Sequence, residues 1–554
     1  MVAIKMKATW RLLYYIFTIS LGGAVVGIDL GIIATTLAQD AFNVYMFPEG
    51  TKNVTSLTGA IVSMGSAGNA IGCLINGLLL ERLGRRKTLL VSTFFTIVGS
   101  AFQTAANGVP LMIVGRFVAG VALGILNPTM PIYISELARP EERARLCGIF
   151  GLMIAIGFCL ANWIGYACSF ASGDVTWRLA LGMQIPTAVL LMVLSMSLPE
   201  SPRWLAQKER YEEFDASLKR IYEDEDEEFF VRSQVEIREQ IQLEGAQRSN
   251  ITVGHALLEI FNRKNIRRTA MAIMVMQVGI LSGSLAIQNY QSILYKSLGF
   301  EGRQVILISG CYGFMGIVGQ IINFYGVSDR WPRVRTMWLG CLILAAMLSI
   351  LMALSRYYGD GHDMAGARAG VAFIFLYSAL YAVFFNSTLY TIAAETFPQH
   401  LRGYGTSIAA LCQNITAIWM GQVTPFAFDA IHWKYYAVFI GCLVALSAFY
   451  GVFLTETNQL SLESIAGAFG DETVAVDKAV AHAHKGEEEG GAEGEKVRND
   501  YQASLSRSFL KLLSDETQQE RLQSKPQLQL PQTLKLIAIL LPVVLEHNRL
   551  RRSP

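Results

Sequence analysis

The amino-acid sequence predicts an all-α membrane protein with twelve transmembrane helices, arranged in two pseudo-symmetric six-helix bundles. The first observation is composition: of 554 residues, 52% are hydrophobic and only 16% are charged, which is far more apolar than a soluble protein. The second is that the apolar residues form runs of about 20 residues, the length that crosses a bilayer. The third is a long polar segment that divides these runs into two sets of six.

The twelve runs are separated by short polar connections. They lie near residues 12–38, 57–80, 88–106, 109–134, 146–170, 179–198, 269–295, 305–327, 336–354, 369–394, 403–428 and 435–454. An even number of spans places both termini on one side of the membrane. The short loops on that side, leaving out the long polar segment, carry fourteen Lys and Arg residues and the opposite loops carry seven. The positive-inside rule therefore predicts that both termini are cytoplasmic, and we expect the protein in the plasma membrane.

The division into domains follows from the same pattern. We expect a cytoplasmic N-terminus (1–11), an N-terminal six-helix bundle (12–198), a cytoplasmic linker with short helices (199–268), a C-terminal six-helix bundle (269–454) and a cytoplasmic tail (455–554). The tail contains "HKGEEEGGAEGEKVRND" and is predicted to be mostly disordered, because it has too little apolar surface to fold. Its apolar run 534–545 is too short for a thirteenth span, which leaves an interfacial segment or a gene-model artefact.

The two halves repeat the same features in the same order. "RLGRRK" follows the second span and "DRWPRVR" follows the eighth, while "PIYISELARPEERAR" ends the fourth and "TIAAETFPQHLRG" ends the tenth. An internal duplication of six helices explains this repetition, and such repeats are common in transporters.

Several functional classes are excluded by the sequence. The eight cysteines show no spacing typical of a disulfide framework or a metal site, so we expect no metal and no cofactor. The sequence shows no catalytic nucleophile and no phosphate-binding loop at a typical spacing, so we do not expect an enzyme. The basic residues lie in short turns rather than on one face, which argues against nucleic-acid binding. We expect a monomer, with Asn53 in "NVT" as a candidate glycosylation site in an external loop.

Only two residues within the predicted spans are charged, Asp29 in "AVVGIDLGIIATT" and Arg116. Charges inside a membrane are costly and are functional by default. At 1.5 Å per residue, Asp29 lies about 14 Å and Arg116 about 11 Å from the outer ends of their helices. The two side chains lie at similar depth, so we expect them to pair.

Several motifs, some within the predicted spans and some in the loops, occur together in this chain. They are "GIDLG", "ERLGRRK", "GRFVAG", "PIYISELARPEER", "WRLALGMQIP", "PESPRWL" at residues 199–205 and "TETNQLSLESI" at residues 455–465. With these motifs the chain resembles the sugar porter family of the major facilitator superfamily, from residue 12 to about residue 465. The resemblance implies the fold stated above and transport of a sugar by alternating access.

The resemblance also implies a conformational latch, in which arginine and carboxylate side chains join helix ends in one state and separate in another. By the resemblance, the latch residues are Arg82, Arg85, Glu136, Arg143, Glu200 and Arg203 in the first half, and Arg330, Arg333, Glu395, Arg402 and Glu456 in the second. Pro332 replaces the glycine of the family and Val334 interrupts the basic run, so we expect a looser latch in the second half.

Asp29 and Arg116 suit proton coupling. A neighbouring arginine favours an ionised carboxylate and a dry environment favours a protonated one, so alternating access to water can shift the balance. In the family the corresponding aspartate often has this role, although some members that carry it are plain facilitators. We expect proton symport, with a facilitated-diffusion uniporter as the first alternative.

The substrate pocket departs from the family. Sugar hydroxyls need amides and aromatic faces, but Gly279 and Ile280 stand where the family has glutamines, and Gly151 replaces another glutamine. Gln413 keeps the family residue. The candidate substrate contacts are Gln413, Asn414, Tyr390, Gln277, Gln288 and Asn289.

The sequence leaves the cargo open among a monosaccharide, a disaccharide, a polyol and another polar solute. A non-transporting nutrient sensor with a transporter fold is the alternative from a different functional class. The presence of Asp29 and Arg116 favours transport.

Overall fold

The computed structural model describes residues 10–138, 143–222, 258–263, 265–297, 300, 302–328, 330–358, 364–397 and 399–458, and the single residues 230, 234, 237 and 469. All of them belong to one compact unit, Met1–Asp471. The predicted tail after residue 458, including the run 534–545, and most of the linker lie outside the described residues apart from Phe469 and the linker residues named above. The domain boundaries expected from the sequence therefore stay predictions.

The described residues contain helices and no strand. The first half contains α1 (Trp10–Leu37), α2 (Asp40–Met46), α3 (Val54–Leu83), α4 (Arg85–Thr104), α5 (Val109–Leu137), α6 (Arg143–Cys168), α7 (Val175–Gly182), α8 (Gln184–Ser195), α9 (Pro202–Gln207) and α10 (Tyr211–Ile221). The second contains α13 (Ile266–Leu281), α14 (Ser284–Ser297), α15 (Arg303–Ile322), the π-helix η1 (Asn323–Val327), α16 (Arg333–Tyr358), α17 (Met364–Phe384), α18 (Thr388–Thr396), α19 (Gln399–Ile431), η2 (His432–Lys434) and α20 (Tyr435–Phe453).

Ten helical segments among the described residues are long and apolar enough to cross a membrane. Three of them are pairs of helices joined at a break, and the last, Leu401–Phe453, contains both α19 and α20. Helix α4 is not among the ten, because it begins with the basic residues 85–87 and its buried face carries a row of polar residues: Thr88, Ser92, Thr93, Thr96, Ser100 and Gln103. If α4 is added to these ten segments and α19 and α20 are counted as two, the arrangement is consistent with the twelve predicted spans.

Two of the helix breaks lie in the second half. Between α13 and α14, Gly283 has a φ of 84°, a left-handed conformation that glycine adopts without strain. Between α17 and α18, residues 385–387 form a turn. Breaks of this kind are tolerated at membrane depth where they are packed in protein or line a cavity.

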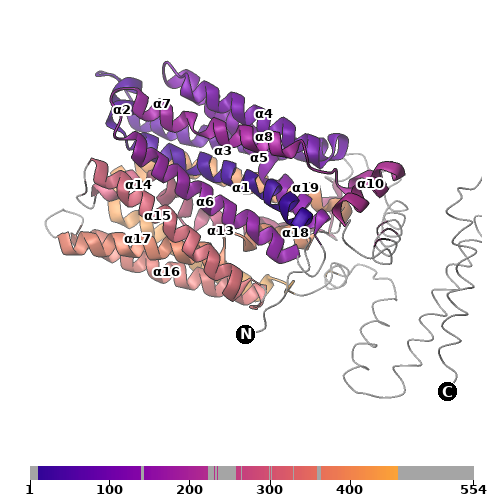
Figure 1. The fold of residues 1–554 in the computed structure, drawn as a ribbon. Helices are drawn as coiled ribbons and strands as arrows, with labels where there is room; N and C mark the ends of the chain where they lie inside the picture. The colour runs from indigo at the N-terminus through magenta and orange to yellow at the C-terminus, as the bar shows by residue number, and fades with distance from the viewer. Residues whose placement is uncertain are drawn as a thin grey trace, which may run out of the picture. The chain divides into compact units, whose positions relative to one another are not determined.

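Helices of the same half pack together. In the first half α1 packs on α6, and α3 and α4 both pack on α5; in the second, α15 packs on α17, α13 on α19 and α16 on α20. Figure 1 shows the indigo-to-magenta helices of the first half beside the pink and orange helices of the second. Contacts between the halves run mainly along α3 with α19, α6 with α15 and α1 with α14.

The polar segment after α8 begins with two short helices. Ser201 accepts a hydrogen bond from the backbone N–H of Trp204 and thereby caps α9. Helix α10 is amphipathic and buries Phe214 and Leu218 against Trp204 and Leu205. The indole N–H of Trp204 donates to the backbone oxygen of Glu81 over 3.0 Å, which holds the start of the segment against the end of the bundle that carries the α3–α4 connection. We call this end the basic end.

Candidate functional site

A central cavity of about 220 Å³ lies between the two halves. Its walls come from α1, α3, α5 and α6 of the first half and from α13, α14, α15, α17, α18 and α19 of the second. Amides, hydroxyls and aromatic rings face the cavity beside apolar residues. Both halves thus contribute to one cavity whose mainly apolar wall carries polar groups.

The two intramembrane charges form an ion pair on the wall of this cavity. Nη1 of Arg116 donates a hydrogen bond to Oδ1 of Asp29 over 2.9 Å. Their side chains are 6% and 7% exposed. The pair predicted from helix depth is therefore formed. Both residues line the cavity, so a solute in the cavity would lie beside the pair.

Close packing of helices α3 and α5 positions Arg116. A Cβ on Gly120 of α5 would clash with the backbone oxygen of Gly65 in α3, so the two helices approach at van der Waals distance. A Cβ on Gly65 would itself lie 2.8 Å from Nη2 of Arg116. The guanidinium group therefore occupies the space that a side chain at residue 65 would fill.

Five of the six predicted substrate contacts line the cavity: Gln413, Asn414, Tyr390, Gln288 and Asn289. Gln277 is not among the lining residues. Gln413 lies against α13 where the chain has no side chain, since a Cβ on Gly279 would be 2.5 Å from its Nε2. The space left by Gly279, where the family has glutamine, is thus occupied by the amide of Gln413 from another helix.

The sequence analysis missed two amides of the first half that line the cavity, Asn69 and Asn127. Asn127 donates to the hydroxyl of Tyr390 over 3.1 Å, and Asn414 donates to Oδ1 of Asn69 over 3.4 Å. Both bonds join the halves across the cavity. The signal in the sequence is an amide inside an apolar run, which both residues show.

Contacts between the halves lie at both ends of the molecule. At the basic end, the Tyr404 hydroxyl donates to Oε2 of Glu81 over 2.7 Å. At the opposite end, Ser63 of α3 donates to Oε1 of Gln422 of α19 over 3.5 Å. The cavity lies between these two sets of contacts, as expected for a site that opens to one side at a time.

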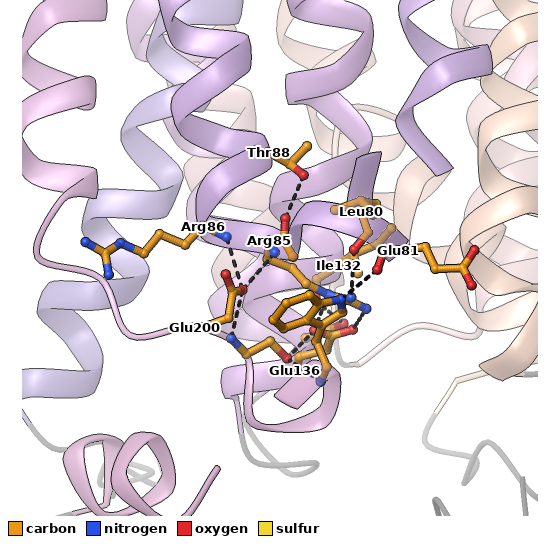
Figure 2. A network of polar contacts seen from close by, with 12 residues as sticks. Leu80, Glu81, Arg85, Arg86, Thr88, Ile132, Glu136 and Glu200 are labelled. Atoms are coloured by element: carbon orange, nitrogen blue, oxygen red, sulfur yellow. Dashed lines mark hydrogen bonds and ion pairs between the residues drawn. The ribbon is translucent and has the colours of Figure 1, made fainter. Parts of the chain in front are cut away.

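A charged network joins helix ends of the first half at the basic end (Figure 2). Arg85 makes a bidentate pair with Glu136, with Nε donating to Oε2 over 2.7 Å and Nη2 to Oε1 over 2.5 Å. Oε1 of Glu200 accepts the backbone N–H groups of Arg85 at 2.7 Å and Arg86 at 3.1 Å. Glu200 thus binds the N-terminus of α4, where the helix dipole favours a negative charge. The Ser201 hydroxyl donates to Oε2 of Glu136 over 2.5 Å.

The second half repeats this network. The backbone N–H groups of Arg333 and Val334 donate to Glu456 over 2.8 and 3.2 Å at the start of α16. The Thr457 hydroxyl donates to Oε2 of Glu395 over 2.8 Å. Arg333 and Glu395 are 3.6 Å apart, a longer pair than in the first half. Ser201 and Thr457 were not predicted from the sequence. Ser201 directly follows Glu200 in the first half, and Thr457 directly follows Glu456 in the second.

Comparisons with known proteins show the family of the chain. Residues 15–469 match the family described as "Sugar (and other) transporter". The chain belongs to this family. Its relatives are transporters of the major facilitator superfamily and not enzymes.

The transporter resembles several curated proteins. It is 32% identical over 462 residues to the MFS-type transporter criB of Aspergillus cristatus, covering 81% of this chain and 92% of that protein. It is 28% identical to the hexose transporter HXT13 of Saccharomyces cerevisiae, covering 81% of each. It is also 28% identical to a quinate permease of Neurospora terricola, covering 84% of this chain and 90% of that protein.

Solved structures share the fold of the transporter. The proton:xylose symporter XylE bound to 6-bromo-6-deoxy-D-glucose superimposes with a TM-score of 0.71 at 21% identity, covering 83% of this chain and 99% of that one. A partially occluded inward-open conformation of the xylose transporter XylE from E. coli gives 0.67 at 18% identity, covering 82% and 100%. The transporter is therefore a multi-pass membrane protein with the major facilitator fold.

The remaining predicted residues of the transporter differ in their exposure. Arg82 and Arg330 are exposed, and Arg203 and Arg402 are half-buried. Arg143 begins α6, but its side chain lies outside the described residues. Asn53 is exposed directly before α3 and has a φ of 63°.

Burial affects the carboxyl of Glu200. Burial raises the pKa of Glu200 above its ordinary value, while the backbone N–H groups of Ser201, Arg86 and Arg85 act in the opposite direction. The loss of water around the carboxylate outweighs the three hydrogen bonds that favour its ionised form.

Proposed function

We propose that the chain is a secondary transporter that carries a sugar or sugar-like solute by alternating access and couples it to protons through Asp29. The observation that supports this proposal is the buried pair of Asp29 and Arg116 on the wall of a cavity shared by both halves. Proton uptake by Asp29 would break the pair, and release of the proton on the other side would restore it.

The polar lining supports a hydroxylated cargo. Amides donate and accept hydrogen bonds at once, and they face the cavity from both halves at Asn69, Asn127, Gln288, Asn289, Gln413 and Asn414. Rings of Phe158, Tyr312, Tyr381 and Tyr390 offer apolar faces. The cavity volume of about 220 Å³ lies below the usual range of about 300–1,000 Å³ for ligand sites. This size favours a monosaccharide or a polyol over a disaccharide.

The networks at the basic end would act as the latch. We propose that this end faces the cytoplasm, as the basic loops favour, and that both termini lie there in a plasma-membrane protein. The pairs Arg85–Glu136 and Arg333–Glu395, with Glu200 and Glu456 on the helix N-termini, would hold each half together in one state.

Uptake by cells that lack their own hexose carriers tests the proposal. Labelled glucose, xylose, sorbitol and maltose would be offered while the external pH is recorded. We expect accumulation of a small hydroxylated solute against its gradient, with alkalinisation of the medium.

Variants at carboxylates separate the alternatives. Asp29→Asn is expected to abolish accumulation while exchange continues, whereas Asp40→Asn, the same change at an exposed carboxylate of α2, leaves both intact. Uptake that never exceeds equilibrium would identify a uniporter. Correct surface expression without uptake of any solute would favour a sensor and sink the transport proposal.

A further inference from the structure

The cavity carries two formal charges that cancel. Asp29 and Arg116 are the charged residues among those that line it. The other ionisable lining groups are the thiol of Cys73 from α3 and the phenols of Tyr312, Tyr381 and Tyr390 from α15, α17 and α18, all neutral at physiological pH. The lining residues from α6 and α14 carry no ionisable group. The net charge of the cavity therefore changes from zero to plus one when Asp29 takes up a proton.

Arg116 has donors that the ion pair does not use. A guanidinium has five N–H groups, and one hydrogen bond from Nη1 to Asp29 is formed. Its Nε is buried and has no hydrogen-bond partner among the described residues. A carboxylate accepts two parallel bonds from such a fork, so a second carboxylate can replace the first when Asp29 is neutral.

From these contacts we propose that the cargo is a polyhydroxy monocarboxylic acid, whose carboxylate pairs with Arg116 while Asp29 holds a proton. This inference rests on the proposed transport function and names its substrate class. The amides around the cavity bind the hydroxyls of the acid, and Arg116 binds its one negative charge.

The charge balance makes the coupling obligatory. An anion beside ionised Asp29 would give the cavity a net negative charge in a low-dielectric site, which is unfavourable. The anion therefore binds together with one proton, and the sum of the two transported charges is zero. A neutral sugar carried with one proton would instead move one positive charge in each cycle.

The test uses the purified full-length chain in proteoliposomes and two matched pairs of solutes. Glucuronate differs from glucose, and gluconate from sorbitol, by a carboxylate in place of a CH₂OH group. At acidic external pH we expect the preferred acid to enter at least about tenfold faster than its neutral partner, the worth of one charge-assisted hydrogen bond. An imposed membrane potential is expected to leave that rate unchanged.

Binding to a variant gives a second, independent readout. Asp29→Asn fixes the cavity in its positive form, so we expect it to bind gluconate at neutral pH at least about tenfold tighter than the unaltered chain. Asp40→Asn is the matched control and is expected to bind as the unaltered chain does.

The outcomes separate the two proposals. Faster uptake of the neutral partners, driven by an inside-negative potential, would overturn the acid cargo and leave sugar transport standing. Gluconate binding by Asp29→Asn no tighter than by the unaltered chain, with sorbitol binding retained, would also overturn it. Absence of uptake for these four solutes, and also for xylose and maltose, would overturn both the acid cargo and the transport function.

Discussion

Arg116 owes its position to a missing side chain on the neighbouring helix. Its guanidinium lies on Gly65, and Gly120 allows α3 and α5 to approach closely enough for this contact. In a densely packed membrane interface, one added methyl group displaces whatever it meets. The geometry of the ion pair is thus encoded partly at residue 65, which carries no functional group.

A substitution at this glycine tests that dependence. Gly65→Ala is expected to push the guanidinium of Arg116, the end of a flexible side chain, away from Asp29. Concentrative uptake should fall about tenfold, and its pH profile should shift. Gly441→Ala in α20 is the control, because its Cβ meets nothing within 4 Å. An unchanged pH profile in Gly65→Ala would refute the positioning role.

At the scale of single elements, α4 and α16 begin in the same way. Each N-terminus donates two backbone N–H groups to a glutamate, Glu200 or Glu456. Glu200 follows α8 and Glu456 follows α20, the last long apolar helix of each half. The following hydroxyl residue, Ser201 or Thr457, donates to the carboxylate of Glu136 or Glu395. The repetition indicates that this arrangement is part of the duplicated unit.

Two substitutions at Glu200 separate capping from charge. Because burial raises the pKa of Glu200, the folded protein holds the proton more tightly than the unfolded chain does. The contribution of this group to stability therefore falls as the pH rises above the ordinary value of 4.5. Glu200→Gln keeps one acceptor oxygen and removes the buried charge, so it should unfold no lower than the unaltered chain at neutral pH. Glu200→Ala loses the cap, a loss of about 0.5–2 kcal/mol.

Thermal unfolding of the detergent-purified chain from acidic to neutral pH measures both effects. The unfolding temperature of Glu200→Gln, relative to that of the unaltered chain, should rise as the pH rises. Equal destabilisation by Gln and Ala would show that the negative charge, and not the acceptor oxygen, holds α4.

At the scale of the whole molecule, the sequence predicted the helical membrane fold and the pairing of Asp29 with Arg116. Long apolar runs fix the spans, and the depth of Asp29 and Arg116 follows from helical rise alone. It did not predict that Gln413 fills the space beside Gly279, or that Asn69 and Asn127 face the second half. Those facts depend on which faces of two distant helices meet, and a single sequence contains no signal for such pairing.

Cross-links between the halves test alternating access directly. Paired cysteines at Ser63 and Gly421, or at Gly77 and Tyr404, can join α3 to α19 at opposite ends of the cavity. A Cβ on Gly421 would lie 3.5 Å from Cβ of Ser63, and one on Gly77 would lie 4.0 Å from Cγ of Tyr404. Oxidation of either pair should reduce uptake to background, and reductant should restore it, because each end must open once in every cycle. A cysteine pair at Trp338 and Ser447, within the second half, is the control and should leave uptake unchanged. Continued uptake with either end fully cross-linked would exclude separation of the halves.

The position of Glu200 in the chain has a consequence for biosynthesis. Its carboxylate closes the first half by binding the start of α4, and it is made before any residue of the second half leaves the ribosome. The first bundle can therefore complete its own clasp while the second is still being translated. Glu456 gives the second bundle the same clasp only after α20 has been synthesised. In each half, the residues that complete the network therefore follow the last long apolar helix, α8 or α20.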